Sequence, residues 1–347
     1  MGKVVNQPVF AQAAPSRRPV LAADVGGTHA RVALVLGQGD SRSPVQVLGH
    51  HRYVGAEWPS LAAILDDFLT THAHLAPLGI ERCAIAIAGY VLGDHVANSN
   101  LPWRVSLPEI RSVPGIEALD VVNDFEAVAY ASQFIDHADT TTILPGLNGG
   151  AGGPVLVMGP GTGLGSAVLL PGAPYAQVLP TEAGQIALAP GNDLEIEILR
   201  ILARTRPYAS YESILSGPGL LDTYRAIAEL SGREATLTTP DAVSAAGMAH
   251  TDPAAHAALD VFCGVLGGFV GDLVMLYGAR GGTFLAGGFL PQMRDFLLAS
   301  RFRERYFNKG VMRPFLEQVP VRLVEHGQLG VVGAATLHAA ARVGSSH

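Results

Sequence analysis

The sequence predicts an α/β protein of two lobes with a cleft between them. A strand, a glycine-rich turn and a second strand occur over 21–35 and again over 155–170. Elsewhere short apolar strands alternate with segments whose apolar residues repeat at helical spacing, a pattern typical of α/β domains. A chain of 347 residues is also long enough for two buried cores. We expect a flexible tail over 1–18, a small lobe over 19–134 with helix 329–341 packing back on it, and a large lobe over 135–328.

The composition argues against several classes of protein. The net charge is −7 and the basic residues form no cluster, which disfavours a nucleic-acid partner. The longest apolar run, 261–271, is too short to span a bilayer, and residues 1–18 lack the apolar core of a secretory signal. Cys83 and Cys263 stand alone in apolar runs, as core residues of a cytoplasmic protein do. We therefore expect no membrane role and a cytoplasmic location.

The lysine content excludes two common kinds of nucleotide site. Lys3 and Lys309 are the only lysines in the sequence. A Walker A loop requires Gly-Lys-Ser/Thr, and a protein kinase requires a lysine on its third strand. Any nucleotide site in this chain must therefore hold phosphate with backbone amides, hydroxyl groups, arginine and Mg²⁺.

In the small lobe, apolar runs and their spacing predict the elements that follow the first hairpin. Leu61, Ile64, Leu65 and Phe68 repeat at helical spacing, with Ser60 as the N-cap. The expected elements are strands over 45–53, 83–88 and 119–122 and helices over 61–69 and 126–132.

In the large lobe, the second hairpin is followed by a mostly helical region. A Gly/Pro-rich stretch over 145–154 precedes it. One expected helix carries Gly264, Gly267, Gly268 and Gly271 on one face, where another backbone can pack closely. The expected elements of this lobe are strands over 155–158, 166–170, 283–286 and 319–324, and helices over 194–202, 220–230, 241–248 and 257–277. The helix over 329–341, which we expect to pack back on the small lobe, follows them.

The first glycine-rich turn has the chemistry of a phosphate site. Asp24 ends the first strand, and Gly26, Gly27 and Thr28 form the turn. Glycine has no Cβ and tolerates a positive φ, so backbone N–H groups at such a turn can approach a phosphate closely. The Asp24 carboxylate could hold a water molecule of a bound Mg²⁺ ion beside that phosphate. One such turn is often only structural, but the second turn, over 161–165, favours the functional interpretation.

The combined motifs identify a family resemblance over 20–341. Segments 24–28, 161–165 and 286–288 resemble the two phosphate motifs and the adenosine motif of the sugar-kinase, actin and heat-shock-chaperone superfamily. Segments 122–125, 182–185 and 215–219 are similar to the bacterial glucokinase family, non-zinc type. The resemblance implies an actin-like, ribonuclease-H-like ATPase fold. It also implies ATP- and Mg²⁺-dependent phosphorylation of glucose at the 6-hydroxyl to glucose 6-phosphate, by a homodimer.

The resemblance assigns roles that local sequence leaves open. Asp124, at the start of a helix, is either a plain helix cap or the base that accepts a proton from the sugar hydroxyl. We expect His29 to have no role in the site. We expect the segment 327–334 to have a mechanical role in packing at the hinge between the lobes rather than a catalytic one. The implied sugar ligands are Asn100, Asn123, Asp124, Glu182, Gln185 and Glu212. The implied nucleotide ligands are Asp24, Val25, Gly26, Gly27, Thr28, Arg31, Gly161, Thr162, Gly163, Gly165, Ser216, Gly217, Gly287 and Gly288, with Asp24 also holding Mg²⁺ through water.

One residue departs from the family pattern and keeps alternatives open. Gln185 stands where family members usually carry a sugar-binding histidine. Glutamine donates and accepts hydrogen bonds but is uncharged at every pH, and one lost hydrogen bond in a buried sugar site costs ~1–3 kcal/mol. The alternatives are a kinase for another hexose and a catalytically weak sugar-binding or regulatory paralogue. A chaperone-type ATPase fits poorly, because no separate substrate domain follows the second lobe.

Overall fold

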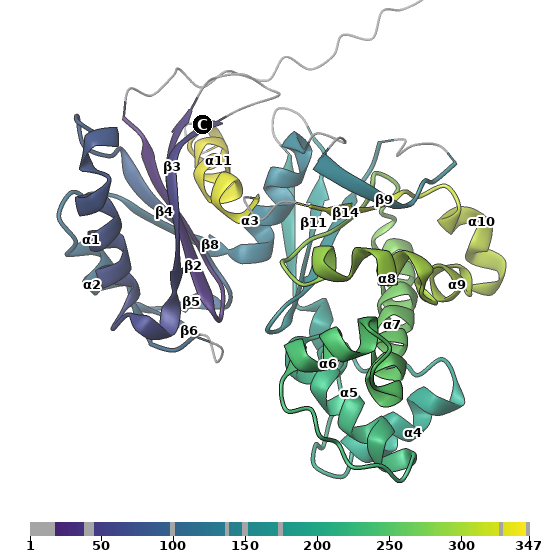
Figure 1. Cartoon of the computed structure of the whole chain (residues 1–347). Coiled ribbons are helices and arrows are strands. Elements are labelled where there is room, and N and C mark those ends of the chain that lie inside the picture. Colours follow the sequence, from purple (N-terminus) through teal and green to yellow (C-terminus); the bar gives the residue numbers. More distant parts are fainter. Residues whose placement is uncertain are drawn as a thin grey trace, which may run out of the picture. The chain divides into compact units, whose positions relative to one another are not determined.

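The computed structural model describes residues 18–37, 45–97, 101–135, 139–147, 152–172, 176–325 and 329–344 (Figure 1). Its described residues form two compact units. The first unit comprises the described residues within Met1–Asp136, Leu169–Leu179 and Gln328–His347. The second unit takes those within His137–Val168 and Pro180–Gly327. The C-terminal segment thus returns to the unit that contains the first hairpin.

The first unit is built on a mixed sheet of five strands in the order β3-β2-β1-β4-β8. β1 pairs antiparallel with β2, as the predicted hairpin requires, and parallel with β4, which in turn runs parallel with β8. The carboxyl ends of β1, β4 and β8 therefore share one edge of the sheet. The strand bounds are β1 Val20–Val25, β2 His29–Gly37, β3 Val45–Val54, β4 Arg82–Ile87 and β8 Leu119–Asn123.

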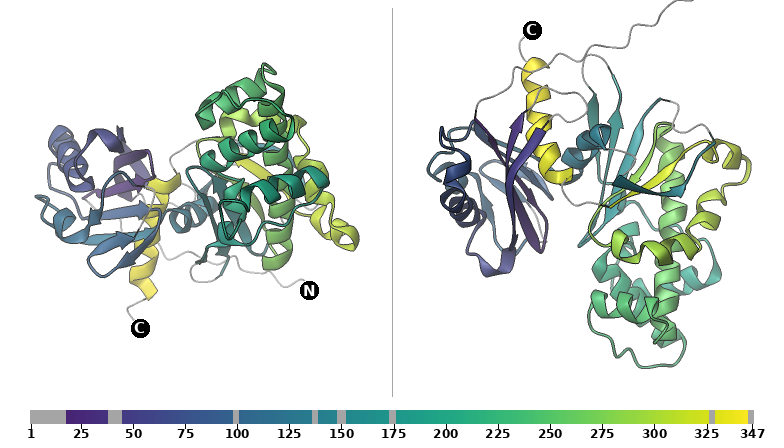
Figure 2. Two further views of the ribbon diagram at one scale, coloured as in Figure 1. Left: turned by 90° about the horizontal axis from the view of Figure 1, so that it is seen from below. Right: turned by 45° about the horizontal axis from the view of Figure 1, so that its top comes forward.

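Two layers of helices cover the two faces of this sheet (Figure 2). Alternate residues of β1 point to opposite faces, so Leu21 packs with α1 (Leu61–Thr71) and α2 (Leu107–Arg111), whereas Ala22 packs with α3 (Asp124–Ala131) and α11 (Leu329–Gly344). The strand residues on the α3/α11 face are mostly small, which lets α11 approach the sheet closely. They are Ala22, Ala33, Val35, Ala84 and Ala86.

Helices α11 and α3 touch through backbone because Gly333 has no side chain. A Cβ at Gly333 would overlap the carbonyl group of Ala127 in α3. Only glycine fits at this position without moving one of the helices. The position of α3, which begins at Asp124, is thus set partly by α11.

The second sheet has six strands in the order β12-β11-β10-β13-β14-β9 and belongs mostly to the second unit, since only residues 169–179, at its β11–β12 end, are assigned to the first. β10, β13 and β14 are parallel, and β9 pairs antiparallel with β14 at the edge. The bounds are β9 Thr140–Leu144, β10 Val155–Pro160, β11 Leu164–Leu170, β12 Gln177–Thr181, β13 Gly282–Leu285 and β14 Val321–Val324.

The helix α7 (Pro253–Tyr277) forms the core of the helical part of this unit, as Figure 1 shows. It is long and apolar enough to cross a membrane by length and composition, but 78% of that apolar window is buried inside the protein, as in the core helix of a soluble protein. The predicted glycine face is confirmed: a Cβ at Gly267 would overlap the Phe302 carbonyl group, and one at Gly271 would lie 2.9 Å from the Tyr306 carbonyl oxygen. Phe302 and Tyr306 both lie in α9 (Phe302–Phe307), so the glycine face packs against the backbone of α9.

Three of the remaining helices are predicted by the sequence, whereas several short helices and strands are not. Helix α4 is Asp193–Leu202, α5 is Gly217–Leu230 and α6 is Pro240–Met248, each near its predicted range. The missed elements are short, so they contain too few turns or alternations to show a clear period. They are β5 Tyr90–Leu92, β6 His95–Ala97, β7 Val105–Ser106, β9, β12, α2, α8 Arg294–Ala299, α9 and α10 Arg313–Leu316.

Candidate functional site

The first glycine-rich turn joins β1 to β2 in the first unit. Gly26 N–H donates to the His29 carbonyl oxygen at 3.0 Å, and the Thr28 carbonyl oxygen accepts the N–H of Gly55 at 2.9 Å. Glycine would tolerate a positive φ in these turns, but neither Gly26 nor Gly161 of the second turn has one. A Cβ at Gly161 would meet open space. At both glycines the missing side chain therefore leaves room beside the backbone rather than permitting an unusual conformation.

Asp24 lies in β1 next to this turn and is held between β2 and α11. Its Oδ2 accepts a hydrogen bond from Nη1 of Arg31, the residue opposite it on β2, at 3.3 Å. On the other side, a Cβ at Gly330 would overlap the Asp24 carboxyl group. The segment expected to be mechanical thus includes a glycine in contact with a predicted nucleotide ligand.

Burial and a neighbouring cation act on Asp24 in opposite directions. Burial raises the pKa of its carboxyl group, while the charge and hydrogen bond of Arg31 lower it, and the effect of burial is larger. His29, in the same hairpin, has a lowered pKa because of burial and the charges of Arg52 and Arg31. Burial, and after it the two neighbouring cations, therefore favour the neutral form of His29.

Asn123 and Asp124 lie at the end of β8 and the start of α3. Asn123 is the N-cap, and its Oδ1 accepts the N–H groups of Phe125 at 3.0 Å and Glu126 at 3.2 Å. The predicted start at residue 126 is therefore wrong by two residues, because the cap is Asn123 and Asp124 is the first helical residue. Asp124 Oδ1 also accepts the N–H of Phe125, at 2.9 Å. The carboxylate is thus fixed at the positive end of a helix dipole.

The first unit brings its candidate residues to one edge of its sheet. Asp24 in β1 is aligned with Ala86 in β4, and the next residue, Ile87, is aligned with Asn123 in β8. Ligands of open α/β sheets bind at the carboxyl ends of parallel strands, where this edge lies. The predicted sugar ligand Asn100 lies outside the described residues.

The second glycine-rich turn joins β10 to β11 in the second unit. It is closed by a hydrogen bond from Gly161 N–H to the Gly163 carbonyl oxygen at 2.7 Å. The Gly217 N–H donates to the Gly161 carbonyl oxygen at 2.8 Å, and a Cβ at Gly287, which has a φ of +103°, would lie 3.2 Å from the Pro160 carbonyl oxygen. The structure thus brings together three predicted nucleotide segments, namely Gly161–Gly165, Ser216–Gly217 and Gly287–Gly288.

Ser216 caps the helix that follows it. Its Oγ accepts the N–H of Gly219 at 3.0 Å and donates to the Glu212 carbonyl oxygen at 2.8 Å. Helix α5 therefore begins beside the second turn, with the N–H of its first residue, Gly217, already bonded to Gly161. Small residues at this point let the three backbones meet.

Two predicted sugar ligands of the second unit, Gln185 and Glu212, touch each other. Gln185 Nε2 donates to Glu212 Oε1 at 3.0 Å. Glu212 Oε2 accepts the N–H of Leu164, the first residue of β11, at 2.8 Å. Gln185 thus supplies a donor to the neighbouring carboxylate, a role its amide can perform at every pH.

Sequence reasoning missed several residues that support this site. Tyr208 Oη donates to the Gln185 carbonyl oxygen at 2.5 Å, and Arg52 Nη2 lies 3.1 Å from His29 Nε2. Arg52 could have been found by counting register, because it lies opposite Arg31 across β2 and β3. Gly184 lies within the predicted sugar-binding segment 182–185, but nothing in the neighbouring sequence indicates that it packs against Leu164.

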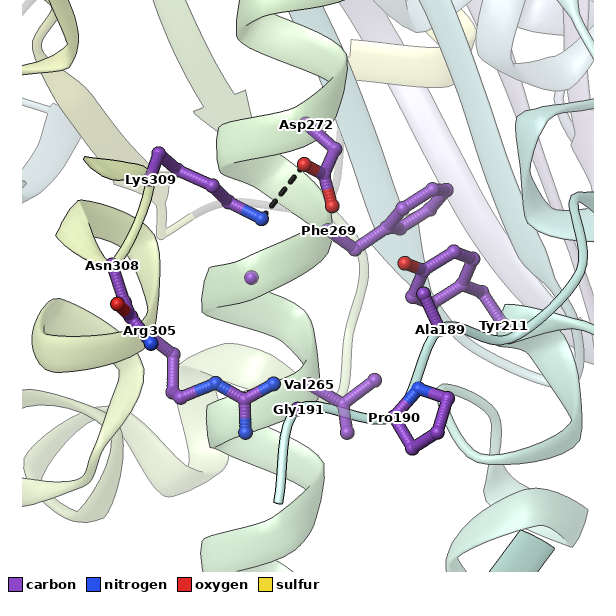
Figure 3. Close-up of a pocket in the computed structure, with 11 residues that line it drawn as sticks. Ala189, Pro190, Gly191, Tyr211, Val265, Phe269, Asp272, Arg305, Asn308 and Lys309 are labelled. Atoms are coloured by element: carbon purple, nitrogen blue, oxygen red, sulfur yellow. Dashed lines mark hydrogen bonds and ion pairs between the residues drawn. The ribbon is translucent and has the colours of Figure 1, made fainter. Parts of the chain in front are cut away.

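A pocket of about 280 Å³ lies in the second unit and is lined in part by Tyr211, the residue before Glu212 (Figure 3). Lys309 and Arg305 point into it, and both are paired: Lys309 Nζ lies 2.7 Å from Asp272 Oδ1, and Arg305 Nη2 donates to Glu195 Oε2 at 3.2 Å. Since both cations already have a carboxylate partner, the pocket offers no free positive charge to a phosphate group among the residues described. Its lining is Ala189, Pro190, Gly191, Tyr211, Val265, Gly268, Phe269, Asp272, Arg305, Asn308 and Lys309.

Comparison with known proteins places this chain and its fold in one class. A family profile described as Glucokinase matches residues 21–341. The chain is 46% identical over 323 residues to a glucokinase-like protein of Xylella fastidiosa (strain 9a5c), covering 93% of this chain and 95% of that protein. The crystal structure of a glucokinase from an Antarctic psychrotroph is 36% identical, with a TM-score of 0.79 and coverage of 93% and 100%. A ROK family glucokinase from Streptomyces griseus, at 20% identity, shares the fold with a TM-score of 0.61 over 92% and 98% of the two chains.

The fold and the family match define a sugar kinase with the actin-like ATPase fold. Its predicted α/β class is confirmed by these relatives and by the mixed sheets of both units. The chain belongs to the glucokinase family. It is an enzyme of the transferase class, with glucokinases among its relatives.

Proposed function

We propose that this sugar kinase transfers the γ-phosphoryl group of ATP to the 6-hydroxyl of glucose, giving glucose 6-phosphate and ADP. The observation that carries the proposal is Asp124 fixed at the N-terminus of α3, within a chain matched to the Glucokinase family over 21–341. The Streptomyces griseus relative, which shares the fold, was solved in complex with glucose and AMPPNP. These relatives support ATP as the donor and glucose as the acceptor.

In the proposed reaction, Asp124 accepts the proton of the sugar 6-hydroxyl while that oxygen attacks the γ-phosphorus. The new O–P bond forms as the bond to the β-phosphate oxygen breaks, and ADP leaves with that electron pair. Phosphoryl transfer is loose and largely dissociative, so positioning of the carboxylate matters more than high basicity. Asn123, Glu182, Gln185, Glu212 and Asn100 would hold the other hydroxyl groups.

The nucleotide would be held without a lysine. The candidate donors are Thr28, Thr162, Arg31 and the backbone N–H groups of the two glycine-rich turns other than those of Gly26 and Gly161, which close the turns. The Ser216 hydroxyl, another predicted ligand, already donates to the Glu212 carbonyl oxygen. Mg²⁺ is bound in phosphoryl-transfer sites by one or two carboxylates, waters and the phosphates, and Asp24 beside the first turn fits that donor set. No group of three or more His, Cys, Asp or Glu residues that could hold a metal ion occurs among the residues described. The ion would neutralise phosphate charge.

A coupled assay of ADP formation with Mg-ATP and a panel of hexoses tests the proposal, with Asp124→Ala beside the wild-type protein. We expect glucose-dependent turnover that falls by about 10²–10⁴-fold or more in Asp124→Ala. Glucose binding by calorimetry should survive the substitution in part. No turnover with any hexose, while glucose still binds, would overturn the kinase assignment for this chain and favour a binding paralogue.

A second candidate is a kinase for another hexose. Gln185 favours it, because the hydrogen-bonding pattern at this position differs from that of the usual histidine, and the Xylella fastidiosa relative is called only glucokinase-like. Turnover with another hexose and not with glucose would select this candidate. We also propose that the protein is a cytoplasmic homodimer. Size-exclusion chromatography with light scattering would test the oligomeric state.

A further inference from the structure

The second glycine-rich turn is fixed at both ends by one short segment, residues 212–217. At one end, Glu212 Oε2 accepts the N–H of Leu164 at 2.8 Å. At the other end, Gly217 N–H donates to the Gly161 carbonyl oxygen at 2.8 Å. A hydrogen bond to a charged acceptor is roughly twice as strong as a neutral one, so the Glu212 contact is the stronger of the two.

The carbonyl side of Leu164 is held as closely as its N–H. A Cβ at Gly184 would overlap the Leu164 carbonyl oxygen and would lie 3.0 Å from the Leu164 Cβ. Gly184 lies between Glu182 and Gln185, two predicted sugar ligands. Leu164 is therefore enclosed by the Glu212 carboxylate on one side and the Gly184 backbone on the other.

The two oxygens of Glu212 serve two different segments. Oε1 accepts Gln185 Nε2 at 3.0 Å, and Oε2 accepts the Leu164 N–H. The Tyr208 hydroxyl fixes the Gln185 backbone through its carbonyl oxygen. Glu212 thus joins the segment with the predicted sugar ligands to the first residue after the predicted phosphate turn.

We propose that Glu212 is a positioning residue for the second phosphate turn, in addition to its proposed contact with the sugar. The inference rests on the proposed function, since it takes the turn over 161–165 to hold nucleotide phosphate. A sugar hydroxyl bound by the same carboxylate would then act directly on the conformation of the turn. Sugar and nucleotide affinities are coupled through Glu212, and each ligand changes the affinity for the other by the same factor.

The decisive measurement is the affinity for Mg-AMPPNP without any sugar, by calorimetry. A residue that only binds sugar would not change it. We expect Glu212→Ala to weaken AMPPNP binding about 10- to 100-fold, the effect of losing a hydrogen bond to a charged group. Glu212→Gln keeps an oxygen for the Leu164 N–H and should lose only about fivefold. Glu109→Ala and Glu109→Gln, at an exposed position on α2, are controls that should bind AMPPNP as the wild-type protein does.

Wild-type affinity in all four variants would overturn the inference and leave the proposed function intact. No AMPPNP binding by the wild-type protein would overturn both. If thermal unfolding shows that Glu212→Ala does not fold, the comparison of Glu212→Gln with Glu109→Gln decides, because neither leaves a cavity. Equal AMPPNP affinity in that pair would overturn the inference.

Discussion

The carboxyl group of Asp24 occupies the space in which a side chain at Gly330 would begin. A Cβ at Gly330 would lie 2.7 Å and 2.8 Å from the two carboxyl oxygens of Asp24. These distances are too short for a real contact, so Asp24 keeps its position only because Gly330 is a glycine. The first turn of α11 thus forms part of the surroundings of the proposed Mg²⁺ and phosphate ligand.

Gly330→Ala should therefore move Asp24 and lower both stability and activity. We expect a loss of about 1–3 kcal/mol in the free energy of unfolding, as for other overpacked sites, with a higher KM for Mg-ATP. Urea unfolding and steady-state kinetics measure the two effects. Gly37→Ala is the matched control, because nothing lies within 4 Å of a Cβ at Gly37. If the two variants behaved alike, the packing of Gly330 against Asp24 would have no energetic consequence.

Asp24→Asn should stabilise the folded protein at neutral pH while abolishing activity. Burial raises the pKa of Asp24, so the folded protein holds this proton more tightly than the unfolded chain. Stability contributed by Asp24 is therefore present below the ordinary carboxyl pKa of about 3.9 and is lost as the pH rises through the raised pKa. Asparagine carries no such penalty, so the gain from Asp24→Asn should grow from about pH 4 upward. Urea unfolding of both proteins over this range checks it; a gain that stayed constant with pH would contradict the assigned cause.

Gln185→His should make the glucose KM depend on pH. A neutral imidazole can donate to Glu212 and accept from a sugar hydroxyl, whereas the protonated form only donates. The KM should therefore rise as the pH falls below about 6.5, while the wild-type KM shows no step there. Gln185→Met, which removes the donor to Glu212, should raise the KM about tenfold at every pH. A wild-type step at the same pH would mean that another group causes it.

Two ion pairs beside the same pocket should differ greatly in their contribution to stability. The Glu195 side chain is 1% exposed and pairs with Arg305, whereas Asp272 is 43% exposed and pairs with Lys309. Arg305→Met leaves a buried carboxylate without its cation and should cost about 3–5 kcal/mol. Lys309→Met leaves a carboxylate that water can reach, so the cost should be at most about 1 kcal/mol. Chemical denaturation of the two variants side by side tests this ranking, and equal costs would refute it.

The sequence by itself determined the local features of this protein. Both glycine-rich turns, the N-cap Ser60 and the glycine face of α7 are encoded within a few residues of where they act. Hydrophobic periodicity is likewise a local property, so the long strands and helices were predicted to within a few residues. The family followed from the combined motifs, since their order along the chain is also read directly.

Only the tertiary structure decided which distant residues meet. Leu164 and Glu212 are 48 positions apart, and Glu195 and Arg305 are 110 apart. Such contacts depend on strand order, register and helix packing, which no local pattern specifies. The glycines at 184, 330 and 333 show the same limit, because each is required by a neighbour far away in the chain. Sequence therefore determined which chemical groups the protein carries, and packing decided which of them act together.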